Sequence, residues 1–290
     1  MNVLQSAIRK AALFFELIKF SHTIFALPFA FMGAILAARG VPAPSTLLWI
    51  VLAMVGARSG AMAINRLADQ EFDAANPRTR ERALPKGLVR RGEVILFTLG
   101  SFALFLFAAA RLNPLCLKLA PFAMAVLILY SYAKRFTFFS HVILGLTLAM
   151  APLGAWIAVS GEIAAVPVVL GLAVLFWVAG FDILYAMADI DFDRVAGLYS
   201  IPARFGAASG MVISRVLHAL TLLLLLLLIF LSGLRSFYLT GVLLASGLLV
   251  YEHLLLLRYG LKRLDAAFFT ANGLLSIILF CFTLLDVVLL

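Results

Sequence analysis

The sequence predicts an all-α integral membrane protein whose helices surround a central cavity. Of the 290 residues, 64% are apolar and only 13% are charged, whereas soluble domains have about 45–50% apolar and about 25% charged residues. The apolar residues recur along the whole chain in blocks of about 20, the number that a helix needs to cross a bilayer core of about 30 Å. The net charge of +9 comes from basic residues between these blocks. It therefore indicates membrane topology rather than nucleic-acid binding.

Nine of these blocks are expected to be transmembrane helices, and one short amphipathic stretch precedes them. Leu4 to Glu16 carries Arg9 and Lys10 among apolar residues, which is typical of a helix that lies on the membrane surface. The transmembrane windows cover residues 17–38, 46–68, 94–112, 115–133, 139–160, 164–188, 210–231, 236–257 and 266–289. Only a very short turn at Asn113 and Pro114 separates the third window from the fourth.

The basic residues predict which side of the membrane each loop faces. When the nine helices are placed in order, most of the 23 basic residues fall on the side of the N-terminus. The exceptions are Arg39, Arg111, Lys118 and Arg235 on the opposite side and Arg58 inside the second helix. Because cytoplasmic loops carry the excess of Lys and Arg, we expect a multi-pass protein of the cell inner membrane with a cytoplasmic N-terminus. The two longest gaps, 74–93 and 194–209, lie on this side and are expected to form a cytoplasmic cap on a single domain covering 1–290.

Two acidic stripes lead into these two gaps. Their polar residues are Asn65, Asp69 and Asp73 in the first stripe, and Asp182, Asp189 and Asp193 in the second. Spacings of four and seven residues place each set on one helix face. Carboxylates at the end of a membrane helix are costly unless they are paired, hydrated or bound to metal. Since Mg²⁺ prefers oxygen ligands and is usually shared with substrate phosphates, the stripes predict a magnesium and phosphate site on the cytoplasmic side.

Several cations are suited to the phosphate in such a site. Arg58 lies two helical turns deeper on the first stripe, and Arg78 and Lys134 lie in the adjoining loops, with Lys19 and Arg204 as further candidates. The other loop arginines, Arg80, Arg82, Arg90 and Arg91, are interpreted as topology signals. The four histidines, His22, His141, His218 and His253, lack the spacing of metal ligands and are interpreted as structural.

At these residues the chain resembles the UbiA family of intramembrane aromatic prenyltransferases. The matching segments are Asn65-xxx-Asp69-xxx-Asp73 with Asn76-Pro77-Arg78-Thr79, then Tyr130-Ser-Tyr-Ala-Lys134-Arg135, and finally Asp182-xx-Tyr185-Ala186-xx-Asp189-xxx-Asp193. The resemblance implies that two Mg²⁺ ions are surrounded by Asn65, Asp69, Asp73, Asp189 and Asp193. It also implies that Arg58, Arg78 and Lys134 bind a diphosphate, and that Tyr130 and Asp182 line the reaction cavity.

The implied reaction is Mg²⁺-dependent transfer of a polyprenyl chain from polyprenyl diphosphate to an aromatic hydroxy acid, similar to 4-hydroxybenzoate, in quinone biosynthesis. Asp182 is the candidate base for the acceptor phenol. An ionised aromatic acid needs a cation inside the membrane, and Lys19 and Arg204 are the cations left for it. The segment Lys19 to Pro28 departs from the pattern of proteobacterial 4-hydroxybenzoate octaprenyltransferases, so 1,4-dihydroxy-6-naphthoate, an acceptor in menaquinone synthesis, stays open.

Two other functions stay open at this point. Intramembrane Asp and Arg residues also suit an ion-coupled secondary transporter, although such a protein should carry charges near the bilayer midplane of several helices. A related enzyme could instead use haem, a chlorophyll precursor or a glycerol ether lipid as its acceptor. The expected partners are the lipid bilayer and the two substrates, and the chain is expected to function as a monomer.

Overall fold

The structure, a computed structural model, describes residues 10, 12–18, 23–264 and 270–290, and all regular elements in these ranges are helical. Eight of the described helices are long and apolar enough to cross a membrane. They are α3 (Pro44–Ala68), α5 (Arg91–Leu112), α6 (Pro114–Ala133), α7 (Ser140–Ser160), α8 (Ala165–Ala186), α10 (Ile201–Ser232), α11 (Ser236–Tyr259) and α12 (Asn272–Leu289). The predicted all-helical membrane fold is therefore confirmed. The expected count of nine is approximate, because the first window corresponds to the shorter helix α2 (Thr23–Ala38).

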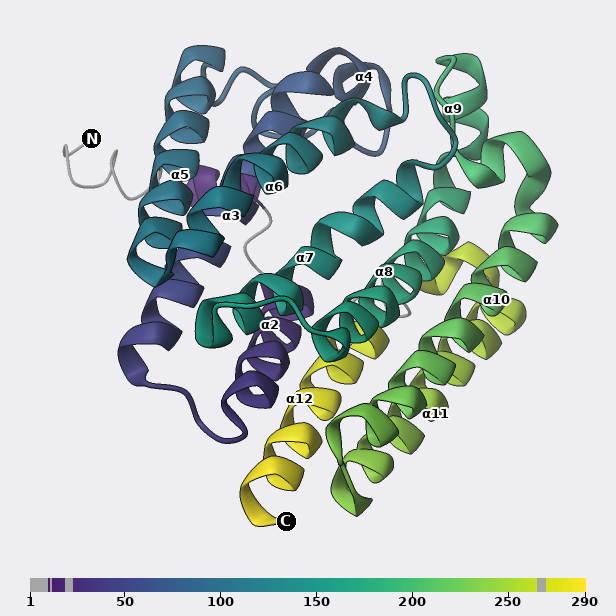
Figure 1. Cartoon of the computed structure of the whole chain (residues 1–290). Helices are drawn as coiled ribbons and strands as arrows, with labels where there is room; N and C mark the ends of the chain where they lie inside the picture. The colour runs from purple at the N-terminus through teal and green to yellow at the C-terminus, as the bar shows by residue number, and fades with distance from the viewer. Residues whose placement is uncertain (1–9, 11, 19–22, 265–269) are drawn as a thin grey trace.

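The helices form two groups that α2 and α7 join (Figure 1). On one side α3 packs against α5 and α6, and on the other α8 packs against α10 while α11 packs against α12. Between these groups α2 contacts α7 and α12, and α7 contacts α8. A buried aromatic and aliphatic cluster around Phe29, Trp177 and Tyr238 fills the second group. The first group encloses a cavity instead, which is described below.

Close helix contacts depend on glycines at two positions. A Cβ added at Gly33 of α2 would overlap the backbone carbonyl of Pro152 in α7, and one added at Gly145 of α7 would overlap the carbonyl of Leu175 in α8. Small residues let backbones approach closely where the surrounding lipid supplies no hydrophobic force between helices. These two glycines therefore let α7 lie close against both α2 and α8.

Local sequence signals explain where several helices begin. Asn113 accepts a hydrogen bond from the backbone N–H of Cys116 at 2.9 Å and starts α6 directly before Pro114. Ser200 likewise accepts from the N–H of Ala203 at 3.2 Å and starts α10. Both are N-caps followed by proline in the first turn, where its missing N–H costs nothing.

One end of the molecule carries the short elements that build the site, and we call it the acidic end. It holds α4 (Gln70–Ala75), the 3-10 helix η2 (Met187–Asp189) and α9 (Ile190–Val195), and Figure 1 shows α4 and α9 at the same end. The predicted gap 74–93 consists mainly of turns before α5. The predicted gap 194–209 is largely helical, since α10 begins at Ile201 and bends at Gly206, where φ is 85°.

The described part of the N-terminal amphipathic stretch packs onto this end of the bundle. Leu13 and Phe14 pack against a buried cluster that contains Leu84, and Lys10 pairs with Glu93 at the start of α5. These contacts place the stretch against the turns that follow the first acidic motif. The expected location on the membrane surface stays a prediction.

Candidate active site

Each acidic motif lies where a long helix gives way to a short one. Asp69 lies between α3 and α4 with φ −90° and ψ 8°, and Asp189 ends η2 directly before α9 with φ −109° and ψ 7°. Both residues have left the α-helical region, so neither stripe continues along one straight helix. Continuous helix faces were expected from the spacing, but the chain turns at the middle polar residue of each motif, Asp69 and Asp189.

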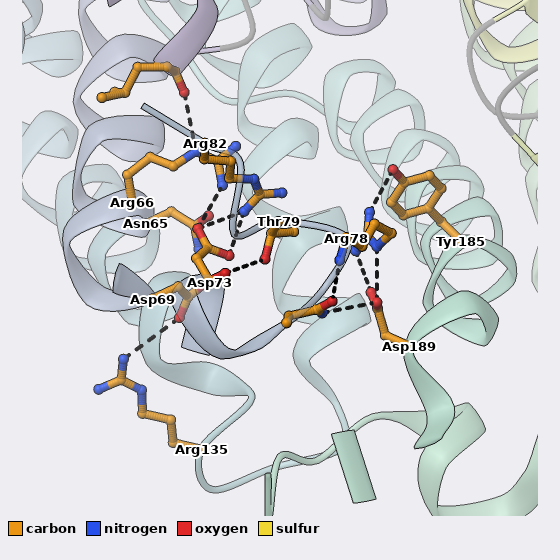
Figure 2. A network of polar contacts seen from close by, with 12 residues as sticks. Asn65, Arg66, Asp69, Asp73, Arg78, Thr79, Arg82, Arg135, Tyr185 and Asp189 are labelled. Carbon is orange, nitrogen blue, oxygen red and sulfur yellow. Dashed lines mark hydrogen bonds and ion pairs between the residues drawn. The ribbon is translucent and has the colours of Figure 1, made fainter. Parts of the chain in front are cut away.

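The first motif brings an amide and two carboxylates together at the end of α3 (Figure 2). Asn65 donates from Nδ2 to Oδ2 of Asp69 at 3.1 Å, and the guanidinium of Arg135 lies 3.7 Å from Oδ1 of the same carboxylate. Burial is the main cause that raises the pKa of Asp69 above its usual range, while Lys134 and Arg135 act against it.

Asp73 is held by arginines (Figure 2). It is only 6% exposed, and Arg82 donates from one nitrogen to its two carboxylate oxygens at 2.7 and 2.8 Å. Arg66 lies 3.8 Å from Oδ2 and donates to the backbone carbonyl of Leu17. The interpretation of Arg82 as a topology signal is therefore incomplete, because its side chain folds back nine residues onto the first motif.

Arg78 links the two motifs (Figure 2). Its Nε donates to Oδ1 of Asp189 at 3.0 Å, a second nitrogen pairs with Oδ2, and a third donates to the hydroxyl of Tyr185 at 2.9 Å. Asn76 also donates to Asp189, at 3.3 Å, and accepts from the backbone N–H of Arg78 at 2.9 Å. Burial alone would lower the pKa of Arg78, but the pair with Asp189 raises it. The turns that follow the first motif thus contact the second motif directly.

Lys134 lies between the motifs at the end of α6. Burial alone would lower the pKa of this ammonium, yet the surrounding carboxylates of Asp182, Asp193, Asp189 and Asp69 raise it above the usual value. Its backbone carbonyl accepts from the N–H of Tyr199 at 2.7 Å, which ties the basic loop to the segment after α9. Lys134 is therefore a permanently charged group among acids from both motifs.

Asp182 has a partner that the sequence analysis did not identify. The Nδ1 atom of His141, at the start of α7, lies 2.6 Å from Oδ2 of Asp182. We interpreted the histidine as structural because it lacks the spacing of a metal ligand, and it is 41 positions from Asp182 in the sequence. No local signal could have found this contact, since it depends on how α7 packs against α8.

A cavity of about 430 Å³ lies among α2, α3, α5, α6 and α7. Arg58 and Tyr130 contribute to its wall, which is otherwise almost entirely aliphatic and aromatic, and it extends to Ile163 beyond the far end of α7. Phe122 of α6 lines the cavity and is 64% exposed, so the cavity reaches the outer surface beside α6. It is long and apolar, which suits an extended hydrocarbon chain.

Arg204 and Lys19 are the cations predicted to bind the acceptor carboxylate. Arg204 is exposed and stacks on the rings of Phe138 and Phe205, with its guanidinium carbon 5.1 and 5.6 Å from their centres. Lys19 lies outside the described residues, and so does His22. The structure therefore places Arg204 against aromatic rings in the first turn of α10.

The donor set at the acidic end fits a hard cation in part. Within the described ranges, no three His, Cys, Asp or Glu side chains are close enough to share one metal ion. The oxygen donors are nonetheless those that Mg²⁺ prefers. Asp193 is only 2% exposed, and its Oδ2 has no hydrogen-bond partner within the same ranges. An orphaned buried carboxylate oxygen is costly, and an ion that also binds phosphate oxygens would satisfy it.

Comparison with known proteins agrees with this architecture. The model of the UbiA prenyltransferase family matches residues 26–274. A 4-hydroxybenzoate octaprenyltransferase from Aeromonas hydrophila is 36% identical over 225 residues, which cover 76% of this chain and 77% of the relative. The apo structure of a UbiA homologue from Aeropyrum pernix K1 superimposes with a TM-score of 0.84 at 33% identity, covering 91% of this chain and 98% of that one.

A second solved structure shares the fold at lower identity. It is a UbiA homologue from Archaeoglobus fulgidus bound to DMAPP and Mg²⁺, with a TM-score of 0.73, 20% identity, and coverage of 96% of this chain and 99% of that one. The family match spans both acidic motifs, the basic loop and most of the described helices. This chain belongs to the UbiA prenyltransferase family and is a multi-pass membrane prenyltransferase.

Proposed function

We propose that this enzyme transfers a polyprenyl chain from polyprenyl diphosphate to an aromatic hydroxy acid of the 4-hydroxybenzoate type. The observation that carries the proposal is the meeting of the two acidic motifs and Lys134 at one end of the bundle that encloses a long apolar cavity. Such a site suits a substrate with an anionic head and a hydrocarbon tail. The name of the Aeromonas relative supports an aromatic acid as the acceptor.

The residues of the two motifs are proposed to hold Mg²⁺ together with the diphosphate. The candidate ligands are Asn65, Asp69, Asp73, Asp189 and Asp193. When bound, Mg²⁺ neutralises the negative charge that develops on the departing diphosphate. The Archaeoglobus homologue, which is bound to both DMAPP and Mg²⁺, supports this assignment. The orphaned oxygen of Asp193 supports it from within this chain.

Three cations are proposed to bind the diphosphate oxygens: Arg58, Arg78 and Lys134. In the structure Arg78 is hydrogen-bonded to the carboxylate of Asp189, and Arg82 to that of Asp73. Arginine forms two-pronged contacts with phosphate as readily as with carboxylate. We infer that both arginines leave the carboxylates for the diphosphate when metal and substrate bind, which makes Arg82 a fourth cation of the diphosphate site. Until then the pairs keep the ligand-free site electrically balanced.

The prenyl chain is proposed to lie in the apolar cavity and to continue toward the lipid beside Phe122. Its allylic carbon then lies near Tyr130, which lines the cavity wall. The bond between this carbon and the diphosphate oxygen breaks, and the diphosphate leaves with the electron pair. Because water would capture the resulting allylic cation, the apolar wall protects it until the acceptor ring attacks.

Asp182 is proposed to be the base that prepares the acceptor. It takes the phenol proton, the ring carbon next to the hydroxyl forms the new bond, and that carbon then loses its hydrogen as the phenol re-forms. One proton is released overall. Lys19 and Arg204 stay the predicted partners of the acceptor carboxylate, and replacing either with Met is expected to raise the acceptor KM more than twofold.

We also propose that residues 1–290 act as a monomeric catalytic domain in the cell inner membrane, with the acidic end in the cytoplasm. The described acids of the two motifs gather at one end of the bundle, and this favours an enzyme over an ion-coupled transporter, which needs charges at midplane. The menaquinone-pathway acceptor, 1,4-dihydroxy-6-naphthoate, is the second candidate, on the strength of the divergent segment from Lys19 to Pro28.

The test is a direct assay of product formation. Membranes that contain the enzyme are given radiolabelled polyprenyl diphosphate with Mg²⁺ and either 4-hydroxybenzoate or 1,4-dihydroxy-6-naphthoate, and lipids are separated by thin-layer chromatography. Membranes with the Asp193→Asn variant serve as the control. A labelled product with 4-hydroxybenzoate supports the main proposal, and one with the naphthoate alone moves the enzyme to the second acceptor. If neither acceptor yields a product that the control lacks, the proposed acceptor class is wrong.

A further inference from the structure

His141 connects Asp182 to the start of α10. The imidazole is completely buried, and its two nitrogens have different partners. Nδ1 lies 2.6 Å from Oδ2 of Asp182, and Nε2 lies 3.3 Å from the backbone nitrogen of Ile201. One histidine thus joins α7, α8 and the first residue of α10.

The partner of Nε2 determines where the imidazole carries its proton. The backbone N–H of Ile201 can only donate, so Nε2 must be the accepting nitrogen. The ring hydrogen therefore sits on Nδ1 and points at the Asp182 carboxylate. A backbone group that selects the tautomer in this way also fixes the orientation of the ring. His141 is consequently a neutral donor to Asp182 rather than an interchangeable polar neighbour.

The contact leaves one oxygen of Asp182 available. Within the described ranges Oδ1 has no hydrogen-bond donor, while the side chain as a whole is 19% exposed. The ammonium of Lys134 also attracts this carboxylate. Asp182 is thus anchored through one oxygen and open through the other, which is the arrangement that a base needs when its accepting oxygen must face a substrate.

We propose that His141 is the positioning residue of Asp182, and that it aims Oδ1 at the phenol of the acceptor. This inference rests on the proposed function, since it requires an acceptor with an ionisable hydroxyl. Because Ile201 begins α10, the segment that follows the second acidic motif helps to set the direction of the base. A histidine kept for stability alone would have no such effect on proton transfer.

The test compares three replacements at one position. Gln offers an amide hydrogen for Asp182 and a carbonyl oxygen for Ile201, so His141→Gln should keep most of the activity. His141→Leu removes both contacts, and His141→Asn is too short to reach both partners. We expect Leu and Asn to lower kcat with the acceptor by about 10- to 100-fold, the range for a misplaced catalytic group. The KM for prenyl diphosphate should stay within about twofold.

A more acidic acceptor separates positioning from folding. A fluorinated 4-hydroxybenzoate ionises more easily and needs less help from a base, so the defect of His141→Leu should shrink at least threefold with it. A structural defect would reduce both acceptors equally. In an Asp182→Asn background, which has already lost the base, His141→Leu should have little further effect. If His141→Leu alone is poorly folded, the comparison of His141→Gln with His141→Asn, with both acceptors, takes its place.

The outcomes distinguish this inference from the proposed function. If the unmodified enzyme prenylates no phenolic acid, the proposed function fails and the inference fails with it. If the unmodified enzyme is active and folded His141→Leu matches it, or loses the same factor with both acceptors, only the role of His141 is overturned.

Discussion

Removing the charge of Lys134 should weaken the binding of prenyl diphosphate more than any change at an exposed loop arginine. The ammonium lies among the carboxylates of Asp182, Asp189, Asp193 and Asp69. In Lys134→Met these acids lose their common cation and repel the diphosphate. A hydrogen bond to a charged group contributes about 1.5–3 kcal/mol, so the dissociation constant should rise about 10- to 150-fold.

The assay is equilibrium binding of a non-reactive prenyl diphosphate analogue to the purified enzyme with Mg²⁺ present. Lys134→Arg, which keeps the charge, should lose less affinity for the analogue than Lys134→Met. The control is Arg90→Met, an exposed change that should stay within about twofold because surface substitutions usually alter free energies by under about 0.5 kcal/mol. Thermal unfolding of each variant shows whether the fold is kept. If Lys134→Met and Arg90→Met bind equally well, the assignment of Lys134 to the diphosphate is wrong.

The pH dependence of binding checks the same assignment. The pKa of Lys134 is raised in the folded protein, so its charge is fully present below the ordinary lysine value and is lost only as the pH passes the higher folded value. Binding that depends on Lys134 should therefore stay constant between about pH 7 and pH 9. A fall within this interval that Lys134→Arg abolishes would show that the lysine titrates there.

Three further predictions concern the metal, the cavity and the fold. Asp189→Asn and Asp193→Asn should each lower kcat by a factor of at least about 10², which corresponds to roughly 2.7 kcal/mol of transition-state stabilisation. EDTA should abolish turnover until Mg²⁺ is restored, and full activity in EDTA would contradict the metal assignment. Ala123→Trp, which fills the cavity wall, should raise the KM of a long polyprenyl diphosphate about tenfold more than that of geranyl diphosphate. Leu129→Trp, on the exposed side of the same helix, should not discriminate between them. Gly145→Ala should lower the free energy of unfolding by about 1–3 kcal/mol through overlap with Leu175, whereas Gly247→Ala, which meets open space, should leave the melting temperature unchanged or slightly raised.

The fold was largely predictable because lipid imposes a simple rule on sequence. Every long apolar block must form a helix that satisfies its own backbone, and all eight long helices overlap the expected windows. The largest discrepancy is α10, which begins at Ile201 rather than near residue 210. Its first turns contain Arg204 and Gly206 and are too polar for an apolar window. The capping signal of Ser200 with Pro202 marks the true start.

The residues of the candidate site could be named from the sequence, but their pairing could not. Spacing and motif together identified Arg78, Lys134 and the acids of both motifs, because these features are local in sequence. Which cation meets which acid depends on loop conformation and helix packing. Arg82 reaches Asp73 through turns that no periodicity encodes, and His141 meets Asp182 only because glycine lets α7 approach α8. Tertiary contacts of this kind are invisible to a pattern within a single segment.

The pairing at the acidic end also constrains how the substrates bind. Asp73 and Asp189 are already neutralised by Arg82 and Arg78, so a divalent ion that binds alone must displace an arginine and leave its charge without a partner. A diphosphate that binds without the ion is repelled by the carboxylates of the two motifs. Under the proposed assignment, the carboxylates would hold the ion while the displaced arginines bind the phosphate oxygens. No charge would then be left without a partner, where an unpaired buried charge costs several kcal/mol. Metal and prenyl diphosphate should therefore each strengthen the binding of the other by the same factor.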